Sequence, residues 1–104
     1  MNPEKKRKLE NAGWRFGDAA DFLELSPQEA EYVELRISLG DAVKQLRKEK
    51  DLTQVELAAR MGSSQSRIAK AETADSSVSL DLLIRYFLAL GATRKDLAKA
   101  ILNG

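Results

Sequence analysis

The chain has 104 residues, of which 43% are hydrophobic, a formal net charge of +1, and neither cysteine nor histidine. This length suffices for one hydrophobic core, and the missing side chains exclude disulfides, thiolate or imidazole metal ligands and a histidine general base. No apolar run approaches the ~20 residues that a membrane helix needs, so we expect a cytoplasmic protein with no membrane contact, metal or other cofactor.

Charge is distributed unevenly along the chain. Residues 1–36 hold 6 Lys or Arg and 8 Asp or Glu, whereas residues 37–104 hold 11 and 8. The later part is therefore the better candidate for binding a polyanion. The acidic pair Asp18 and Asp21 is accompanied by no nucleophile and no phosphate-binding glycine loop, so we expect no enzymatic activity.

The spacing of apolar residues predicts helices throughout the chain and no strands. Short helices are expected at about 3–11 and 18–25. Three aromatic residues in this region, Trp14, Phe16 and Phe22, suggest either a small satellite core beneath the next helix or a binding site for a partner protein.

A long helix is predicted to begin at Pro27 and to continue to about Lys50. Ser26 can cap it, proline suits the first turn, and Glu29 completes a capping box. Gly40 could bend or divide this helix, because glycine is a poor helix former.

Capping residues divide the rest of the chain into four further helices, expected at about 53–61, 64–72, 79–90 and from 93 onward. The third of these is apolar nearly all round and must be covered on several sides. We expect either a dimer interface that includes Tyr86 and Leu90, or burial of this helix beneath the N-terminal helices.

The stretch LTQVELAARMGSSQSRIAKAE, residues 52–72, holds two short helices separated by Gly62. Glycine can adopt the positive φ that a tight corner between helices requires. The two helices are expected to share an apolar inward side made of Val55, Leu57, Ala58, Met61, Ile68 and Ala71.

The outward side of the second helix is polar and consists of Gln65, Ser66, Arg67 and Lys70. Amide, hydroxyl and cationic groups at the leading end of a helix suit the DNA major groove, where Gln can bind adenine and Arg can bind guanine. Gln54 and the helix start at Ser64 are placed to hold backbone phosphates. An ordinary solvated helix face is the alternative.

A buried ion pair is predicted between Arg47 and Glu72. Glu72 lies four residues after the inward Ile68, and Arg47 lies four residues after the inward Val43. A carboxylate in such a place needs a partner, so the pair would lock the long helix onto the polar helix.

The run from Leu52 to Ala58, followed by Gly62, Ile68 and Glu72, resembles the lambda-repressor/Cro-type helix-turn-helix, also called the Xre family. The resemblance covers about residues 38–102. It implies an all-α fold in which a five-helix DNA-binding domain, residues 38–104, follows an N-terminal helical extension, residues 1–37.

The same resemblance implies phosphate contact from Gln54 and base contacts from the positions of Gln65, Ser66, Arg67 and Lys70. The Arg47–Glu72 pair matches a salt bridge found in some phage repressors of this type. Ala74 and Val78 stand where glycine and proline are common, which leaves the geometry of this loop open.

The N-terminal segment and the stretch SVSLDLLIRYFLALGA resemble a subgroup of small Xre regulators, the HigA-type antitoxins. We therefore predict a homodimeric transcriptional regulator, most simply a repressor, that binds double-stranded DNA. The alternative is an antitoxin that also binds and neutralises a RelE/HigB-like RNase toxin and represses its own operon.

Overall fold

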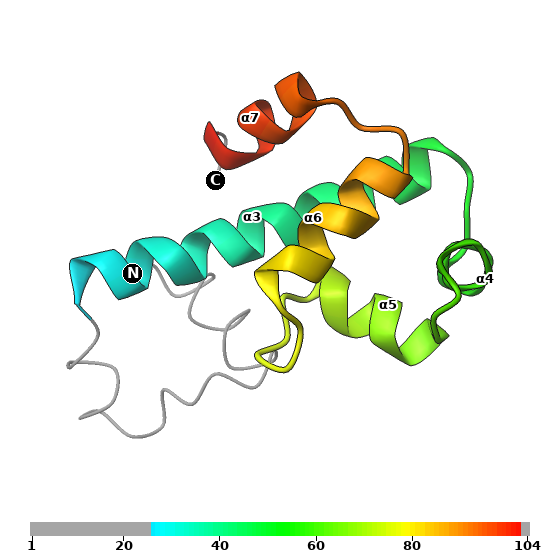
Figure 1. Ribbon diagram of the computed structural model, residues 1–104, viewed down its shortest axis with the longest axis horizontal. Helices are drawn as coiled ribbons and strands as arrows, with labels where there is room; N and C mark the ends of the chain where they lie inside the picture. Colours follow the sequence, from blue (N-terminus) through cyan, green and yellow to red (C-terminus); the bar gives the residue numbers. More distant parts are fainter. Residues whose placement is uncertain (1–25, 103–104) are drawn as a thin grey trace.

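The computed structural model describes residues 26–102, and within that range the fold is all-α, as predicted. Expectations for residues 1–25, including the aromatic cluster, lie outside the described residues. No helix in the described range is both long and apolar enough to cross a membrane. The helices are α3 (Pro27–Glu49), α4 (Gln54–Met61), α5 (Gln65–Glu72), α6 (Leu80–Ala89) and α7 (Arg94–Leu102), arranged around the long α3 (Figure 1).

Helix α3 begins at the predicted cap, where the Ser26 hydroxyl accepts a hydrogen bond from the Glu29 amide at 3.1 Å. It continues without interruption across residues 37 and 38, the predicted domain boundary. Gly40 does not divide this helix, contrary to one of the two expectations for it. A Cβ at Gly40 would lie 2.8 Å from the Ala71 carbonyl oxygen, so glycine here allows the end of α5 to pack directly on α3.

The corner between α4 and α5 has the predicted geometry. Thr53 and Glu56 form a complete capping box at the start of α4, and the bonds that Glu56 accepts lower its pKa. Gly62 ends the helix in the left-handed region with φ of 62°. Ser64 then caps α5.

Val55 does not belong to the inward side of α4, contrary to expectation, because it is 63% exposed. Leu57 and Ala58 are buried, and Val55 lies about 160° from Leu57 around the helix. In a helix of two turns only one narrow side can face the core, and Val55 falls beyond its edge.

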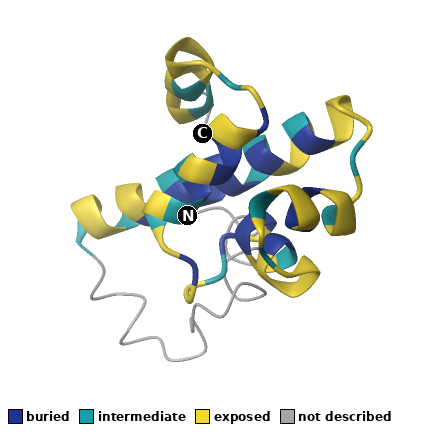
Figure 2. Ribbon diagram, turned by 45° about the vertical axis from the view of Figure 1, so that its right-hand side comes forward, coloured by how far each residue is buried: buried dark blue, intermediate teal, exposed yellow. Residues whose placement is uncertain are grey.

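The core lies where α3 and α6 pack against each other and against the inner sides of α4 and α5 (Figure 2). Tyr86 and Leu90 are 1% and 5% exposed, so they are buried in their own chain and a dimer interface at these two residues is wrong. The Tyr86 hydroxyl lies 3.2 Å from the Ser63 hydroxyl, which gives this buried polar group a partner at the α4–α5 corner.

Arg36 anchors the loop between α5 and α6. It is buried on α3, and its guanidinium donates hydrogen bonds to the carbonyl oxygens of Asp75, at 2.9 Å, and of Val78. Its charge lies 5.8 Å from the centre of the Tyr32 ring. In the same loop Ala74 adopts φ of 54°. Alanine therefore occupies a left-handed backbone conformation that glycine adopts more easily.

We expect Gly40→Ala to lower the free energy of unfolding by about 1–3 kcal/mol in urea denaturation. The added methyl group would overlap the α5 backbone, and this overpacking outweighs the ~1 kcal/mol that alanine gains in helix propensity. The control is Gln45→Ala at an exposed position of the same helix, which should change stability little. A Gly40→Ala protein more stable than the native chain would contradict the close approach.

Candidate nucleic-acid interface

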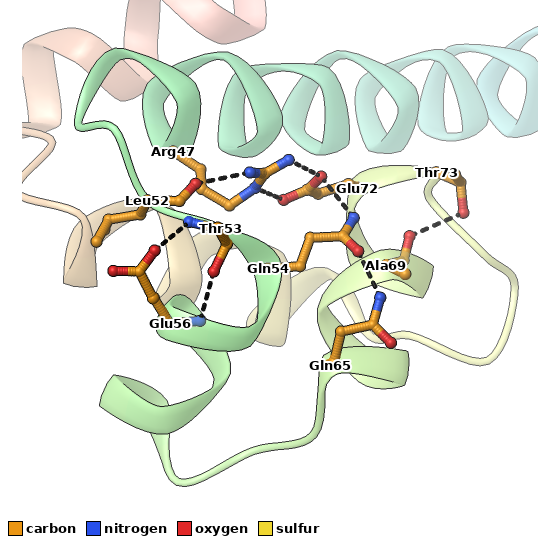
Figure 3. Close-up of polar contacts among 9 residues, drawn as sticks. All are labelled: Arg47, Leu52, Thr53, Gln54, Glu56, Gln65, Ala69, Glu72 and Thr73. Atoms are coloured by element: carbon orange, nitrogen blue, oxygen red, sulfur yellow. Dashed lines mark hydrogen bonds and ion pairs between the residues drawn. The ribbon is translucent and has the colours of Figure 1, made fainter.

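Arg47 and Glu72 form a buried ion pair between α3 and α5 (Figure 3). Arg47 Nε donates to Glu72 Oε2 at 2.5 Å and Nη2 donates to Oε1 at 3.0 Å. Arg47 Nη1 also donates to the Leu52 carbonyl oxygen at 2.7 Å, which ties the turn before α4 to the same group. The hydrogen bond to Glu72 raises the pKa of Arg47, so the guanidinium stays charged despite its burial.

A chain of side-chain amides extends this pair to the surface. Gln54 Nε2 donates to Glu72 Oε1 at 3.1 Å, and Gln54 Oε1 accepts from Gln65 Nε2 at 2.6 Å (Figure 3). An ionised carboxylate can only accept hydrogen bonds, so Glu72 fixes which end of the Gln54 amide faces it. The Gln54 oxygen must then face Gln65, which leaves the Gln65 oxygen and its second N–H for other partners. We refer to Glu72, Gln54 and Gln65 as the amide relay.

The amide relay was not predicted from the sequence. The sequence alone predicted only a phosphate contact for Gln54. The structure gives Gln54 two protein partners, and the phosphate contact stays a prediction that would use the remaining amide hydrogen. A signal was present in the sequence. Gln54 and Gln65 are each the first residue of their helices, and Glu72 was expected to face inward.

The predicted reading face lies on the outer side of α5. Ser66, Arg67 and Lys70 are exposed, and within residues 26–102 their side chains make no hydrogen bond or ion pair. The Ser64 hydroxyl accepts a hydrogen bond from the Arg67 amide at 3.2 Å, so Ser64 serves as the helix cap. The structure therefore brings four exposed polar side chains together on one short helix, with Gln65 held at its start.

A groove of about 410 Å³ lies beside this face, between α5 and the start of α6. One wall contains the two cationic side chains of α5, and the other comes from the loop that Arg36 anchors; the lining residues are Ser64, Ser66, Arg67, Lys70, Ser77, Val78, Ser79 and Leu82. Sequence reasoning missed Ser77 and Ser79 as part of the site. The serine-rich run directly after the polar helix could have indicated them.

The far wall of the groove is ordered by a local turn. Asp75 Oδ1 accepts hydrogen bonds from the Ser77 hydroxyl at 2.7 Å and from the Ser77 amide at 2.9 Å. These bonds lower the pKa of Asp75, with a smaller contribution from the nearby charges of Lys70 and Arg36. The Asp75 carboxylate is thus bonded within the loop and does not line the groove, whereas hydroxyl groups and cations do.

The chemistry of this surface suits binding an anionic partner. Among residues 26–102 no group of three or more Asp or Glu side chains is placed to hold a metal ion. The exposed groups are amides, hydroxyls and cations, which together donate to phosphates and pair with base edges.

Comparison with known proteins identifies the same region. The family model described as Helix-turn-helix matches residues 43–97, which is more than half of the chain. The matched range begins within α3, ends within α7, and contains the ion pair, the amide relay and the groove. A search of curated proteins and a search of solved structures each found no match.

We expect Glu72→Gln to lower the free energy of unfolding by about 3 kcal/mol, because removing one partner of a buried pair leaves the other charge uncompensated. Urea denaturation measures this loss. The control is Arg85→Gln, which removes the exposed pair between Arg85 and Asp81 and should have little effect. Equal losses in the two variants would show that the buried pair does not hold α5 in place.

Proposed function

Since the chain belongs to the helix-turn-helix family of lambda-repressor-like DNA-binding regulators, we propose that it is a cytoplasmic, sequence-specific transcriptional repressor. In this proposal α5 enters the major groove of double-stranded DNA with its leading end against the base edges. Gln65, Ser66, Arg67 and Lys70 carry specificity, and Gln54 and Ser64 help to hold the phosphate backbone.

The observation that carries the proposal is the orientation of the Gln65 amide. The amide relay leaves an oxygen acceptor and one N–H donor of the exposed Gln65 without a hydrogen-bond partner among the described residues. Adenine presents a donor at N6 and an acceptor at N7 in the major groove, whereas guanine presents two acceptors. A glutamine held in this orientation therefore favours adenine over guanine.

The groove beside α5 supports contact with the sugar–phosphate backbone. Arg67 and Lys70 supply positive charge on one wall, and Ser77 and Ser79 supply hydroxyl groups on the other. The lining residue Ser79 is also the cap of α6, and the start of a helix favours a negatively charged group. Affinity that depends on such contacts falls steeply as salt concentration rises.

We propose further that the chain acts as a homodimer. Two-fold symmetry would place two α5 helices in successive major grooves, with half-sites about one helical turn, or ~34 Å, apart. A dimer bound across a promoter would exclude RNA polymerase, which is why repression is the expected effect.

We expect Arg67→Ala to lose ~1–3 kcal/mol of binding free energy at one base pair and to relax the preference there. The probe is a duplex selected by the native protein from a random 25-base-pair pool, and binding is measured by fluorescence anisotropy on single-base variants of it. Failure of the pool to yield any enriched sequence would overturn the proposed function. Equal weakening on every variant would make Arg67 a phosphate contact instead.

The amide relay gives a second prediction with the same probes. Gln65→Ala should reduce discrimination between adenine and guanine at one position by ~1–3 kcal/mol, and Gln54→Ala should reduce it at that same position by freeing the Gln65 amide. Gln45→Ala, an exposed glutamine of α3, is the matched control and should leave discrimination unchanged. Full discrimination in Gln54→Ala would contradict the role of the relay.

The antitoxin alternative rests on the resemblance to HigA-type regulators and makes a different prediction. Co-expression with the product of the adjacent gene, followed by size-exclusion chromatography, should then give a stable complex. A neighbouring product that is not toxic and does not co-elute would remove this alternative and leave the repressor alone.

A further inference from the structure

The first turns of α3 extend beyond the helix that covers its later part. Lys99 of α7 lines a groove together with Glu49, whereas Ile101 lines a different groove together with Tyr32. Helix α7 therefore runs toward the start of α3, and it ends at Leu102 before it reaches that start (Figure 1). One side of the first turns of α3 is consequently left open by the described part of the chain.

The open side holds a groove of about 350 Å³, which we call the α3–α7 groove. Tyr32, Leu35 and Ile101 supply its apolar lining, and Glu31 and Glu34 supply its charged groups. No lysine or arginine is among the described residues that line it. Tyr32 and Ile101 are 44% and 46% exposed, so two large hydrophobic side chains meet solvent at one place. Such clustering marks a contact site more often than scattered exposed residues do.

The α3–α7 groove is continuous with the core. Leu39 follows Leu35 by one turn on the same side of α3, and it is only 1% exposed. This side of the helix is therefore apolar over several turns, but the described residues cover only its later part. An apolar helix side of this kind is stable in water when another segment packs on it.

The segment that precedes α3 joins the helix at the same end. Phe16 is ten residues before Ser26, and ten residues span up to ~33 Å when extended. Tyr32 and Leu35 lie only ~9 and ~14 Å along α3 from Ser26. A segment on so short a tether has an effective concentration roughly in the millimolar range, so it has an advantage over any separate molecule.

The composition of this segment matches the groove in size and in charge. Trp14 and Phe16 stand on either side of Arg15. A cavity of ~150 Å³ holds one benzene ring, so the groove has room for two aromatic rings. Residues 1–17 hold five Lys or Arg and two Glu, whereas residues 27–35 hold three Glu and no Lys or Arg. The basic segment and the acidic start of α3 therefore attract each other.

We propose that Trp14 and Phe16 of the same chain fill the α3–α7 groove, with Arg15 beside the carboxylates of its rim. The aromatic side chains then complete the apolar side of α3 that α7 leaves open. Of the two alternatives for these aromatic residues, this proposal favours the satellite core over a site for a partner protein. The groove also faces away from α5, because Gly40, where α5 packs, lies about 140° around α3 from Leu35.

The first experiment uses the fluorescence of Trp14, which is the only tryptophan of the chain. In the native chain its emission should be blue-shifted, and less quenched by acrylamide, relative to N-acetyltryptophanamide. Ile101→Glu places a charge in the groove and should reverse both effects. Val55→Glu introduces the same charge at an exposed valine of α4 and should reverse neither. Native emission equal to that of the free amide, or equal effects of the two variants, would overturn the proposal.

The second experiment uses a disulfide, because the chain has no cysteine of its own. In Phe16→Cys/Leu35→Cys, a disulfide within one chain should form in dilute, air-equilibrated solution, since the proposal brings these two positions within bonding distance. The control is Phe16→Cys/Glu29→Cys, which should react more slowly. Glu29 is nearer to the tether, but it lies about 120° around α3 from Leu35.

Mass spectrometry follows the rate of disulfide formation in both variants. Equal rates in the two variants would show that the segment does not rest in the groove, and would leave its aromatic residues to a partner protein. A disulfide that joins two chains through Leu35→Cys would show that the groove holds the segment of another copy. Either result would overturn the proposal.

Neither measurement contains DNA, so the outcome is separate from that of operator binding. A chain with Trp14 in the groove that selects no sequence from the random pool would support this proposal and overturn the repressor. A chain that selects a sequence while Trp14 emits like the free amide would overturn the groove assignment alone.

Discussion

The buried carboxylate of Glu72 is the group on which the position of the predicted reading face depends. It receives two hydrogen bonds from Arg47 on α3 and one from Gln54 on α4, so three helices are joined at one side chain. A buried ion pair adds little net stability compared with an apolar contact of the same size. Its directional bonds join α5 to α3 and α4 at defined atoms, whereas an apolar contact has no such direction.

The long helix α3 contacts both α5, which carries the predicted reading face, and the loop that follows α5. At Gly40 the α5 backbone approaches so closely that a side chain would not fit. The Arg36 guanidinium donates hydrogen bonds to two carbonyl groups of the loop between α5 and α6. These two contacts position α5 and the groove wall relative to each other. Their role explains why α3 continues through the predicted boundary at residues 37 and 38, because Arg36 lies on one side of that boundary and Gly40 on the other.

The sequence predicted what depends on local interactions. Ser26, Thr53 and Ser64 mark helix starts because capping requires only neighbouring residues, and Gly62 marks the corner because its backbone conformation is local. The spacing of four residues from Val43 and Ile68 was enough to place Arg47 and Glu72 together, because each helix was already oriented by an apolar residue. The predicted base contacts from α5 stay predictions, although the structure leaves these side chains exposed.

What sequence reasoning missed depends on which neighbour approaches from which side. Val55 was assigned inward because spacing alone cannot say where a narrow apolar side ends. The close packing of α5 against Gly40 was not foreseen because that contact is not local. The burial of Tyr86 and Leu90 follows from how α6 packs against α3, with a partner for the Tyr86 hydroxyl on the distant Ser63. The amide relay joins residues up to 18 positions apart, and only the folded corner brings them within hydrogen-bond distance.

In the proposed complex, Glu72 and Gln54 hold the Gln65 amide in an orientation that suits adenine. The most direct measurement replaces the adenine opposite Gln65, in a selected duplex, by 7-deazaadenine, which lacks only the N7 acceptor. The account predicts a loss of about tenfold in affinity for the native protein, as for one hydrogen bond, and almost none for Gln65→Ala. An equal loss in both proteins, or no loss in either, would contradict it.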